Sequence, residues 1–184
     1  HAVRGPFLRY EVIEDNYVKV INRDLIAKPE FFEKGFNATL QVTRALESWG
    51  SSRSAWLYSA QAAGGVTLPW RHDLFATVKA QRQMASTGTP LSQAGFALRY
   101  YAPQVPRAAF FAALSGDIQG DGGGAPDQLL LGGDNGLRGY PLRYQSGERR
   151  ALLTVEQRYY SDWYIFRLAR VGAAFPWPLA GLAA

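Results

Sequence analysis

The sequence has 184 residues, of which 47% are hydrophobic and 14% aromatic, so it carries enough apolar surface for one folded domain and is not a disordered chain. Its net charge of +5 comes from 20 basic and 15 acidic residues scattered along the chain, and the lack of a basic block argues against nucleic-acid binding. With no cysteine it has neither disulfides nor thiolate metal sites, and 19 glycines and 10 prolines among many aromatic residues predict a turn-rich, all-β fold.

The beginning of the chain, residues 1–4, lacks the charged and then apolar pattern of a signal peptide, and its abrupt start predicts that a preceding part is missing. Two short strand-like runs follow, Phe7 to Ile13 and Tyr17 to Ile21. The turn-forming residues 14–16 between them predict a hairpin. No segment approaches the ~20 consecutive apolar residues that a transmembrane helix needs.

The middle of the chain alternates between apolar and polar residues with the period of a β-strand. Phe36 to Leu46, Trp56 to Ala62 and Leu74 to Met84 each place apolar side chains on one face and polar side chains on the other. Two residues of the third run break the rule, because Phe75 falls on the polar face and Arg82 on the apolar face. These runs predict strands with one apolar and one polar side.

Four further runs extend this pattern to eight or nine strands in sequence-adjacent pairs. Phe96 to Ala102 alternates, and Arg107 to Asp117 is apolar on both faces, with a position that favours a strand over a short helix. Arg150 to Tyr160 and Trp163 to Ala174 follow. The expected fold is therefore an antiparallel meander.

The connections between these runs differ in length. Residues 103–106 and 161–162 are tight, whereas residues 118–149 are long, glycine-rich and polar. Short turns on one side of the membrane and longer loops on the other are typical of transmembrane barrels, whose strands of about ten residues alternate lipid-facing apolar with lumen-facing polar side chains. A soluble β-sandwich gives the same alternation with its apolar side inward, so the alternation alone leaves both folds open.

The polar faces would line the lumen of such a barrel. Aromatic residues gather near the predicted strand ends, where a barrel has girdles at the lipid headgroups, although core aromatics of a sandwich explain them equally well. The polar side chains expected to face the lumen are Lys79, Gln81, Arg99, Glu156 and Arg158.

One arginine, Arg138, lies among glycines at the tip of the long loop. Gly132, Gly133 and Gly136 allow positive φ and close approach of the backbone, so we expect them to act as hinges that deliver Arg138 to a fixed partner. An exposed turn arginine without a role is the alternative.

The run Leu137-Arg138-Gly139-Tyr140 follows Leu131-Gly132-Gly133 and precedes a strand that carries Glu156-x-Arg158. In this setting it resembles the Omp85 superfamily of outer-membrane barrels, which includes bacterial surface antigen D15. The resemblance covers about residues 35 to 174 and is sharpest from residue 130 to residue 158.

This resemblance implies a sixteen-stranded barrel of the bacterial outer membrane whose sixth extracellular loop folds back inside. Arg138 would contact an inner-wall strand, with Glu156 as the nearest candidate partner. Members of the family insert or assemble other barrels, or translocate polypeptides, so client polypeptides and membrane lipid are the implied partners. Arg44, Arg53 and Arg82 near the predicted outer ends are candidates for lipopolysaccharide phosphates, with scattered surface charge as the alternative.

The sequence departs from the family at its end. An aromatic-x-Asp-x-Gly motif whose acid engages the loop arginine is expected after Phe175, but Pro176-Trp177-Pro178 stands there. Two prolines so close predict the end of a ladder strand. Residues 1–184 are therefore interpreted as a partial C-terminal barrel domain with a truncation or a reading-frame change near Phe175 and an atypical end over residues 175–184.

Catalysis finds little support in the sequence. His72 has no recognisable nucleophile spacing, and Asp117, Asp121 and Asp127 lack the spacing of a calcium loop, so we expect neither an enzyme nor a cofactor or metal. Two other functions stay open. One is a soluble β-sandwich or small barrel that binds carbohydrate or protein through its aromatics, and the other is a passive porin-like channel.

Overall fold

The computed structural model describes residues 2–86, 90–120, 128–133, 136, 140–166, 169–177 and 181–183. They form a mostly β protein, as expected, with two single-turn 3-10 helices, η1 (Glu47–Trp49) and η2 (Pro69–Arg71). The strands in chain order are β1 (Phe7–Ile13), β2 (Tyr17–Ile21), β3 (Pro29–Glu33), β4 (Asn37–Ala45), β5 (Ala55–Leu68), β6 (His72–Ala85), β7 (Leu91–Val105), β8 (Ala108–Gly120), β9 (Leu129–Leu131), β10 (Gln145–Gly147), β11 (Arg149–Ile165), β12 (Ala169–Trp177) and β13 (Gly181–Ala183).

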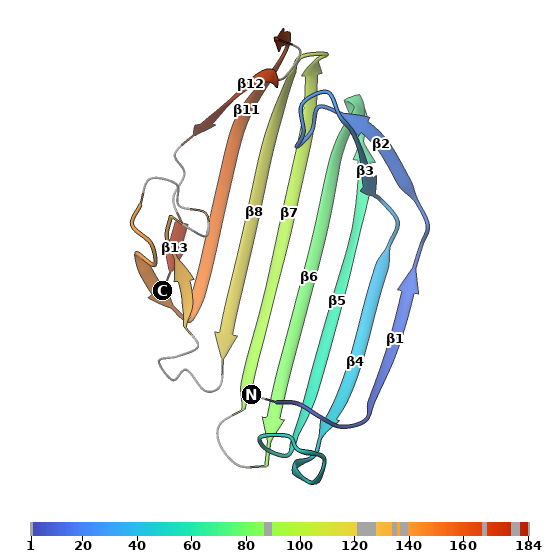
Figure 1. Cartoon of the computed structure of the whole chain (residues 1–184), viewed down its shortest axis with the longest axis vertical. Helices are drawn as coiled ribbons and strands as arrows, with labels where there is room; N and C mark the ends of the chain where they lie inside the picture. Colours follow the sequence, from blue (N-terminus) through green and yellow to red (C-terminus); the bar gives the residue numbers. More distant parts are fainter. Residues whose placement is uncertain are drawn as a thin grey trace.

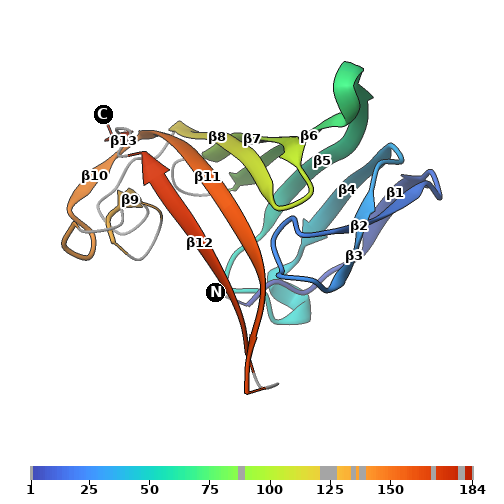
Figure 2. The same cartoon turned by 90° about the horizontal axis from the view of Figure 1, so that it is seen from above.

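One antiparallel sheet contains most of these strands, in the order β1-β4-β5-β6-β7-β8-β11-β12. β13 pairs with β11, and β2–β3 and β9–β10 form two separate two-stranded sheets. Figure 1 shows the long strands side by side, and Figure 2 shows that the sheet curls into an open arc. The described strands do not close into a barrel, since β1 and β12 lie at the two ends of the strand order.

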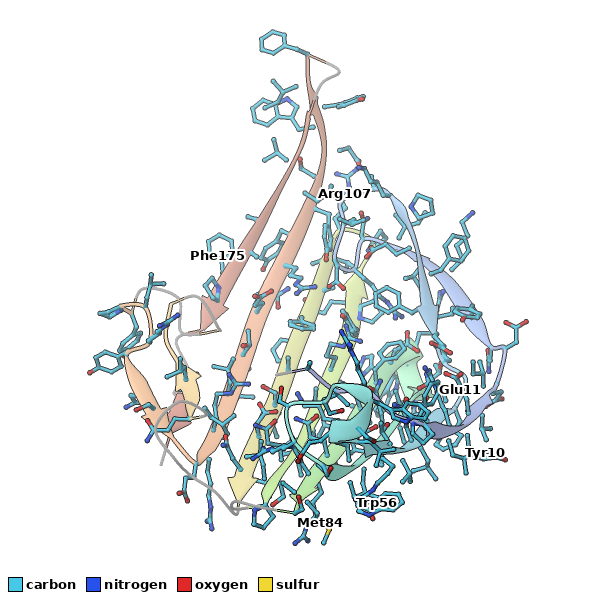
Figure 3. All side chains as sticks on the ribbon, turned by 60° about the horizontal axis from the view of Figure 1, so that its bottom comes forward. Tyr10, Glu11, Trp56, Met84, Arg107 and Phe175 are labelled. Carbon is cyan, nitrogen blue, oxygen red and sulfur yellow. The ribbon has the colours of Figure 1, made fainter. Side chains whose placement is uncertain are left out.

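The alternating apolar and polar residues of the sequence point to opposite faces of this sheet. Because neighbouring strands pair in continuous register, residues of like parity line up in rows across the sheet. The rows on the convex face are mostly apolar, and those on the concave face are mostly polar. Figure 3 shows Tyr10, Trp56 and Met84 on the outer side of the curved sheet.

The connections differ between the two ends of the sheet (Figure 1). Residues 69–71 join β5 to β6 and residues 106–107 join β7 to β8, and we call this the tight-turn end. Residues 46–54 and 121–148 make the longer β4–β5 and β8–β11 connections at the opposite, long-loop end. The expected difference in loop length holds for these four connections. It does not hold for the β1–β4 connection, residues 14–36, which is long and lies at the tight-turn end.

The expected hairpin of the first two strands is wrong. β1 pairs with β4, so that Phe7 lies opposite Thr43, and β2 pairs with β3 instead. The short run β3, which begins at a proline, was not expected as a strand. The residues between β1 and β4 form an excursion with its own hairpin, β2–β3, which lies on the concave side of the sheet (Figure 2).

The tight connection expected at residues 161–162 is also wrong. β11 continues through Ser161 and Asp162 to Ile165, with only a register irregularity between Tyr160 and Tyr164. β12 includes Pro176, which lies opposite Glu156, and ends at Trp177, so this strand does end where the two prolines predicted. An edge strand tolerates proline because alternate backbone N–H groups of such a strand have no ladder partner.

The buried apolar core is small. Phe75, Tyr101 and Phe111 form its centre, and Phe32 of the β2–β3 hairpin packs against them. Phe75, the sequence exception on the polar face, is therefore the residue on which the hairpin rests. No helix in the described part of the chain is long and apolar enough to span a bilayer.

Candidate functional site

Polar side chains cross the concave face in rows. One row consists of Gln41, Ser59, Gln81, Gln93 and Gln119, which lie opposite one another from β4 to β8. Within it the Gln81 amide nitrogen donates to the Gln93 amide oxygen at 2.5 Å. Side chains of this kind hydrogen-bond both to one another and to water, so this face suits a hydrated interior.

The next row toward the tight-turn end contains ion pairs. Asp117 on β8 lies 2.6 Å from the Arg150 guanidinium of β11 and 3.2 Å from the Lys79 ammonium of β6. The strand between β6 and β8 contributes Gly95 at this level. A Cβ atom there would lie 2.8 Å from the Lys79 side chain and would also meet the Asp117 carboxylate. The glycine therefore leaves the space in which Lys79 reaches Asp117.

A second charged cluster holds the β2–β3 hairpin to the tight-turn end of the concave face. The Arg23 guanidinium of the hairpin pairs with Asp73 on β6, which is only 4% exposed. The Lys34 ammonium lies 2.6 Å from the other Asp73 oxygen, and the Thr67 hydroxyl donates to that same oxygen at 2.8 Å. One buried carboxylate thus binds two cations of the excursion.

The other side of the hairpin is held by β11. Arg158 donates to the Arg23 carbonyl at 2.7 Å and to Asp24 at 2.9 Å, while its Nε donates to Glu156 at 2.8 Å. The Tyr160 hydroxyl also donates to the Arg23 carbonyl, at 2.8 Å. The residue pair Arg23 and Asp24 is therefore clamped between β6 and β11, and we call these contacts the hairpin anchor.

Aromatic rings surround the cations of the hairpin anchor. The Arg23 guanidinium carbon lies 4.8 Å from the centre of the Phe32 ring and 5.1 Å from that of Tyr101, and the Arg158 carbon lies 3.9 Å from that of Phe111. Such cation–π contacts stabilise a desolvated guanidinium. Burial lowers the pKa of Arg23, although Tyr101, Glu30 and Asp24 nearby act to raise it. The pKa of Lys34 is also lowered, first by burial and second by the positive charge of Arg23.

The hairpin loop is shaped before it reaches the sheet. The Glu30 carboxylate accepts hydrogen bonds from the backbone amides of Arg23, Asp24 and Leu25, at 3.0 to 3.2 Å. Asn22 adopts a φ of 62° and its side-chain oxygen accepts from the Ala27 amide at 2.6 Å. Asparagine tolerates this left-handed conformation better than most residues. The loop thus presents Arg23 and Asp24 in a fixed geometry.

A cavity of about 760 Å³ lies on the concave face beside the hairpin. Its wall mixes acids, bases and amides from the β2–β3 hairpin and from the sheet, including Glu11, Glu33, Lys79, Asp117 and Arg150. A wall of mixed charge without a large apolar area suits water and extended polar chains better than a compact apolar ligand.

The residues predicted from the loop motif are only partly described. Leu137, Arg138 and Gly139 lie outside the described residues. Tyr140 is half-exposed, and its ring centre lies 5.2 Å from that of Tyr144.

The hinge glycines of the long loop lie in close contacts. Gly136 has a φ of 126°, and a Cβ there would meet the Leu152 side chain, so both its backbone conformation and its surroundings require glycine. A Cβ on Gly132 would lie 2.7 Å from the Pro141 carbonyl oxygen, and the Gly133 amide donates to that oxygen at 3.1 Å. Close backbone approach explains Gly132 without a positive φ.

Glu156 and Arg158, predicted to face the lumen, do lie on the concave face. Glu156 is 6% exposed and accepts from Arg158, which the sequence analysis did not expect. The sequence analysis also missed Arg23, Asp24 and Asp73. The one available signal was Phe75, an apolar residue on a polar face two positions after Asp73, which marks a place where another segment covers the sheet.

The arrangement holds distant chain segments in place. His72 pairs through its Nδ1 with the Tyr100 hydroxyl at 2.6 Å, and no acid or nucleophile completes that pair among the contacts of the described residues. In the same part of the chain, no three histidine, aspartate or glutamate side chains are placed to hold a metal ion.

Comparison of the chain with models of protein families, with curated proteins and with solved structures finds no match.

Proposed function

We propose that the chain is part of a transmembrane β-barrel of the Omp85 type, a non-enzymatic protein of the bacterial outer membrane that inserts other barrels or translocates polypeptides. The observation that carries the proposal is the apolar convex face, which no second layer covers in the described part of the chain. Large apolar side chains stand exposed along it, among them Leu8, Leu40, Trp56, Val78 and Phe96.

The spacing of aromatic residues on this face supports a membrane setting. Trp56 lies level with Met84, and Tyr100 lies level with Leu74, so these two aromatic rows are ten positions apart on β6. Ten residues extend over about 33 Å of strand. At the tilt of about 40° found in such barrels, the band between the rows is about 25 Å tall, as expected for a lipid-facing surface.

The concave face supports the same conclusion from the other side. Its glutamine row and its ion pairs would line an aqueous lumen, and the mixed-charge cavity of about 760 Å³ suits the passage or handling of an extended polypeptide. A soluble sandwich requires the opposite arrangement, with the apolar face covered and the polar face in solvent.

The assembly role itself comes from the motif Leu137-Arg138-Gly139-Tyr140 and its resemblance to the Omp85 superfamily. In this proposal Arg138 holds the long loop inside the lumen against the β11 wall, where Glu156 is a buried acid. A guanidinium in such a place is stabilised by a carboxylate or by several carbonyls.

The membrane setting is tested by two substitutions on β6. Val78, 53% exposed, lies in the middle of the convex face, and Gln81, also exposed, lies three positions away on the concave face. Val78→Arg should destabilise the membrane-inserted state by about 2–4 kcal/mol, whereas Gln81→Arg should leave it nearly unchanged. The measurement is co-flotation of the refolded protein with lipid vesicles. Equal flotation of both variants, or a monodisperse folded protein in plain buffer, would contradict the proposal.

The assembly role is tested with Arg138→Ala, matched by Arg143→Ala in the same loop. Vesicles that contain the protein are given an unfolded client barrel, and client folding is followed by its altered mobility in electrophoresis without heating. We expect slower client folding and faster protease cleavage of the loop for Arg138→Ala only. Unchanged client folding would reject the loop lock, and ion conductance without any effect on clients would favour a passive channel.

A further inference from the structure

A groove of about 650 Å³ crosses the convex face near the long-loop end. Ala60, Ala80 and Ala94 form one row of its floor, and Ile118 continues that row onto β8. Tyr58 stands at its edge on the neighbouring row. Its volume lies within the range of about 300–1,000 Å³ that small-molecule sites occupy.

Two arginines border this apolar groove. Arg82 lies level with Tyr58, and Arg149 lies level with Ile118, and both are exposed. No aspartate or glutamate is among the described residues that line the groove. Arg82 is also the residue that breaks the apolar alternation of its strand, so its charge stands on a face of β6 that is otherwise apolar.

We propose that this groove binds one anionic, phosphate-bearing lipid, with an acyl chain along the alanine floor and the anionic headgroup between Arg82 and Arg149. The inference rests on the proposed membrane setting of the convex face. It goes further because it assigns a specific lipid site with a charge preference to two named residues.

The chemistry fits both halves of such a lipid. A guanidinium binds phosphate through paired N–H donors, and its five donors allow Arg82 to bind a phosphate beside the other interaction that it has in the fold. The apolar floor matches a hydrocarbon chain. At the next row toward the long loops, the Arg44 guanidinium carbon lies 5.0 Å from the Trp56 ring centre, which adds a cation and an aromatic residue at headgroup level.

Native mass spectrometry of the full chain tests this site. The protein is released from neutral detergent micelles that contain equal amounts of dioleoylphosphatidylglycerol and dioleoylphosphatidylcholine. We expect retention of one phosphatidylglycerol in preference to phosphatidylcholine. The double variant Arg82→Gln, Arg149→Gln should weaken this retention about tenfold, whereas Arg99→Gln, an exposed arginine of the concave face, should not.

A second variant separates the groove from its charges. Ala80→Phe fills the floor without changing the charge, and it should also reduce phosphatidylglycerol retention. Glycerol phosphate, which is a headgroup without acyl chains, should not bind to any variant. Equal retention of the two lipids, full retention by Ala80→Phe, or an equal loss in Arg99→Gln would overturn the proposal. Lipid retention is measured in micelles and does not depend on vesicle flotation. A failure of the lipid site can therefore be distinguished from a failure of the proposed membrane setting.

Discussion

The two faces of the sheet obey the same alternation but satisfy it in opposite ways. On the convex face, apolar side chains such as Leu40 and Val78 are about half exposed and touch no covering layer in the described part of the chain. On the concave face, Asp73 and Glu156 are almost fully buried. Asp73 is bound by cations of the distant β2–β3 excursion, and Glu156 is bound by Arg158 of its own strand.

This contrast teaches where the stability of the fold comes from. A soluble β protein buries its apolar face, but here the largest buried cluster is only Phe75, Tyr101 and Phe111, and it lies on the polar side beneath a hairpin. Backbone ladders and paired charges therefore carry much of the tertiary organisation of the described residues. In the proposed membrane setting, lipid removes the convex face from water.

Among the concave-face residues, substitution of Asp73 should cause the largest loss of stability. Asp73→Ala removes the shared partner of Arg23 and Lys34 and leaves two largely buried cations uncompensated, so we expect the unfolding free energy to fall by about 3–5 kcal/mol. The measurement is denaturant unfolding in detergent micelles, with hydrogen exchange over residues 22–34 to locate the loss. A change of less than about 1 kcal/mol would mean that the hairpin anchor is not a stabilising unit.

Gly95→Val is the next largest disturbance. A side chain at this position collides with the Lys79 and Asp117 side chains, and we expect a loss of about 1–3 kcal/mol from overpacking and a broken ion pair. Ala97→Val, two positions away on the same face, is the matched control and should have a smaller effect. Equal losses for the two variants would show that strand propensity, not the ion pair, sets the preference for glycine.

Tyr160→Phe sharpens the comparison at one hydrogen bond. The hydroxyl donates to the Arg23 carbonyl in a buried setting, so its removal should lower stability by about 1 kcal/mol. Tyr159→Phe changes the neighbouring, half-exposed tyrosine of the convex face and should leave the denaturant midpoint unchanged. The reverse order of effects would contradict the assignment of the two faces.

Glu11→Ala gives the smallest expected effect. Glu11 pairs with Arg9 on the concave side of β1 at 2.8 Å, but both side chains are more than 40% exposed, so the pair should contribute less than about 0.5 kcal/mol. Measured beside Asp73→Ala, this variant separates buried from hydrated charge pairs. A loss similar to that of Asp73→Ala would show that the concave face is drier than proposed.

Much of the sheet follows from the sequence because alternation is a local property. The runs between Phe36 and Ala102 correspond to β4 to β7. The run that is apolar on both faces, from Arg107 to Asp117, corresponds to β8, which begins at Ala108. The partner strand of β1 could not be predicted from alternation. Its partner β4 lies beyond an inserted hairpin, and adjacency in sequence favoured the wrong neighbour.

The site was less accessible to sequence reasoning. Glu156 and Arg158 were found because they continue a visible polar face, but Arg23 and Asp24 read as ordinary turn residues. Their partners Asp73 and Arg158 are 50 and 134 positions away, and no local pattern reports such a distance. The two breaks in alternation, Phe75 and Arg82, were the sequence positions that marked the hairpin's resting place and the groove.

The large sequence separation across the hairpin anchor also bears on the order of folding steps. Asp24 can meet Arg158 only when nearly the whole described chain has been made and its sheet has been laid down, because loops of that length close late and slowly. The β11 half of the hairpin anchor therefore forms at a late stage of folding. Until that stage, the hairpin can be held on the β6 side alone, through Asp73 and Phe75.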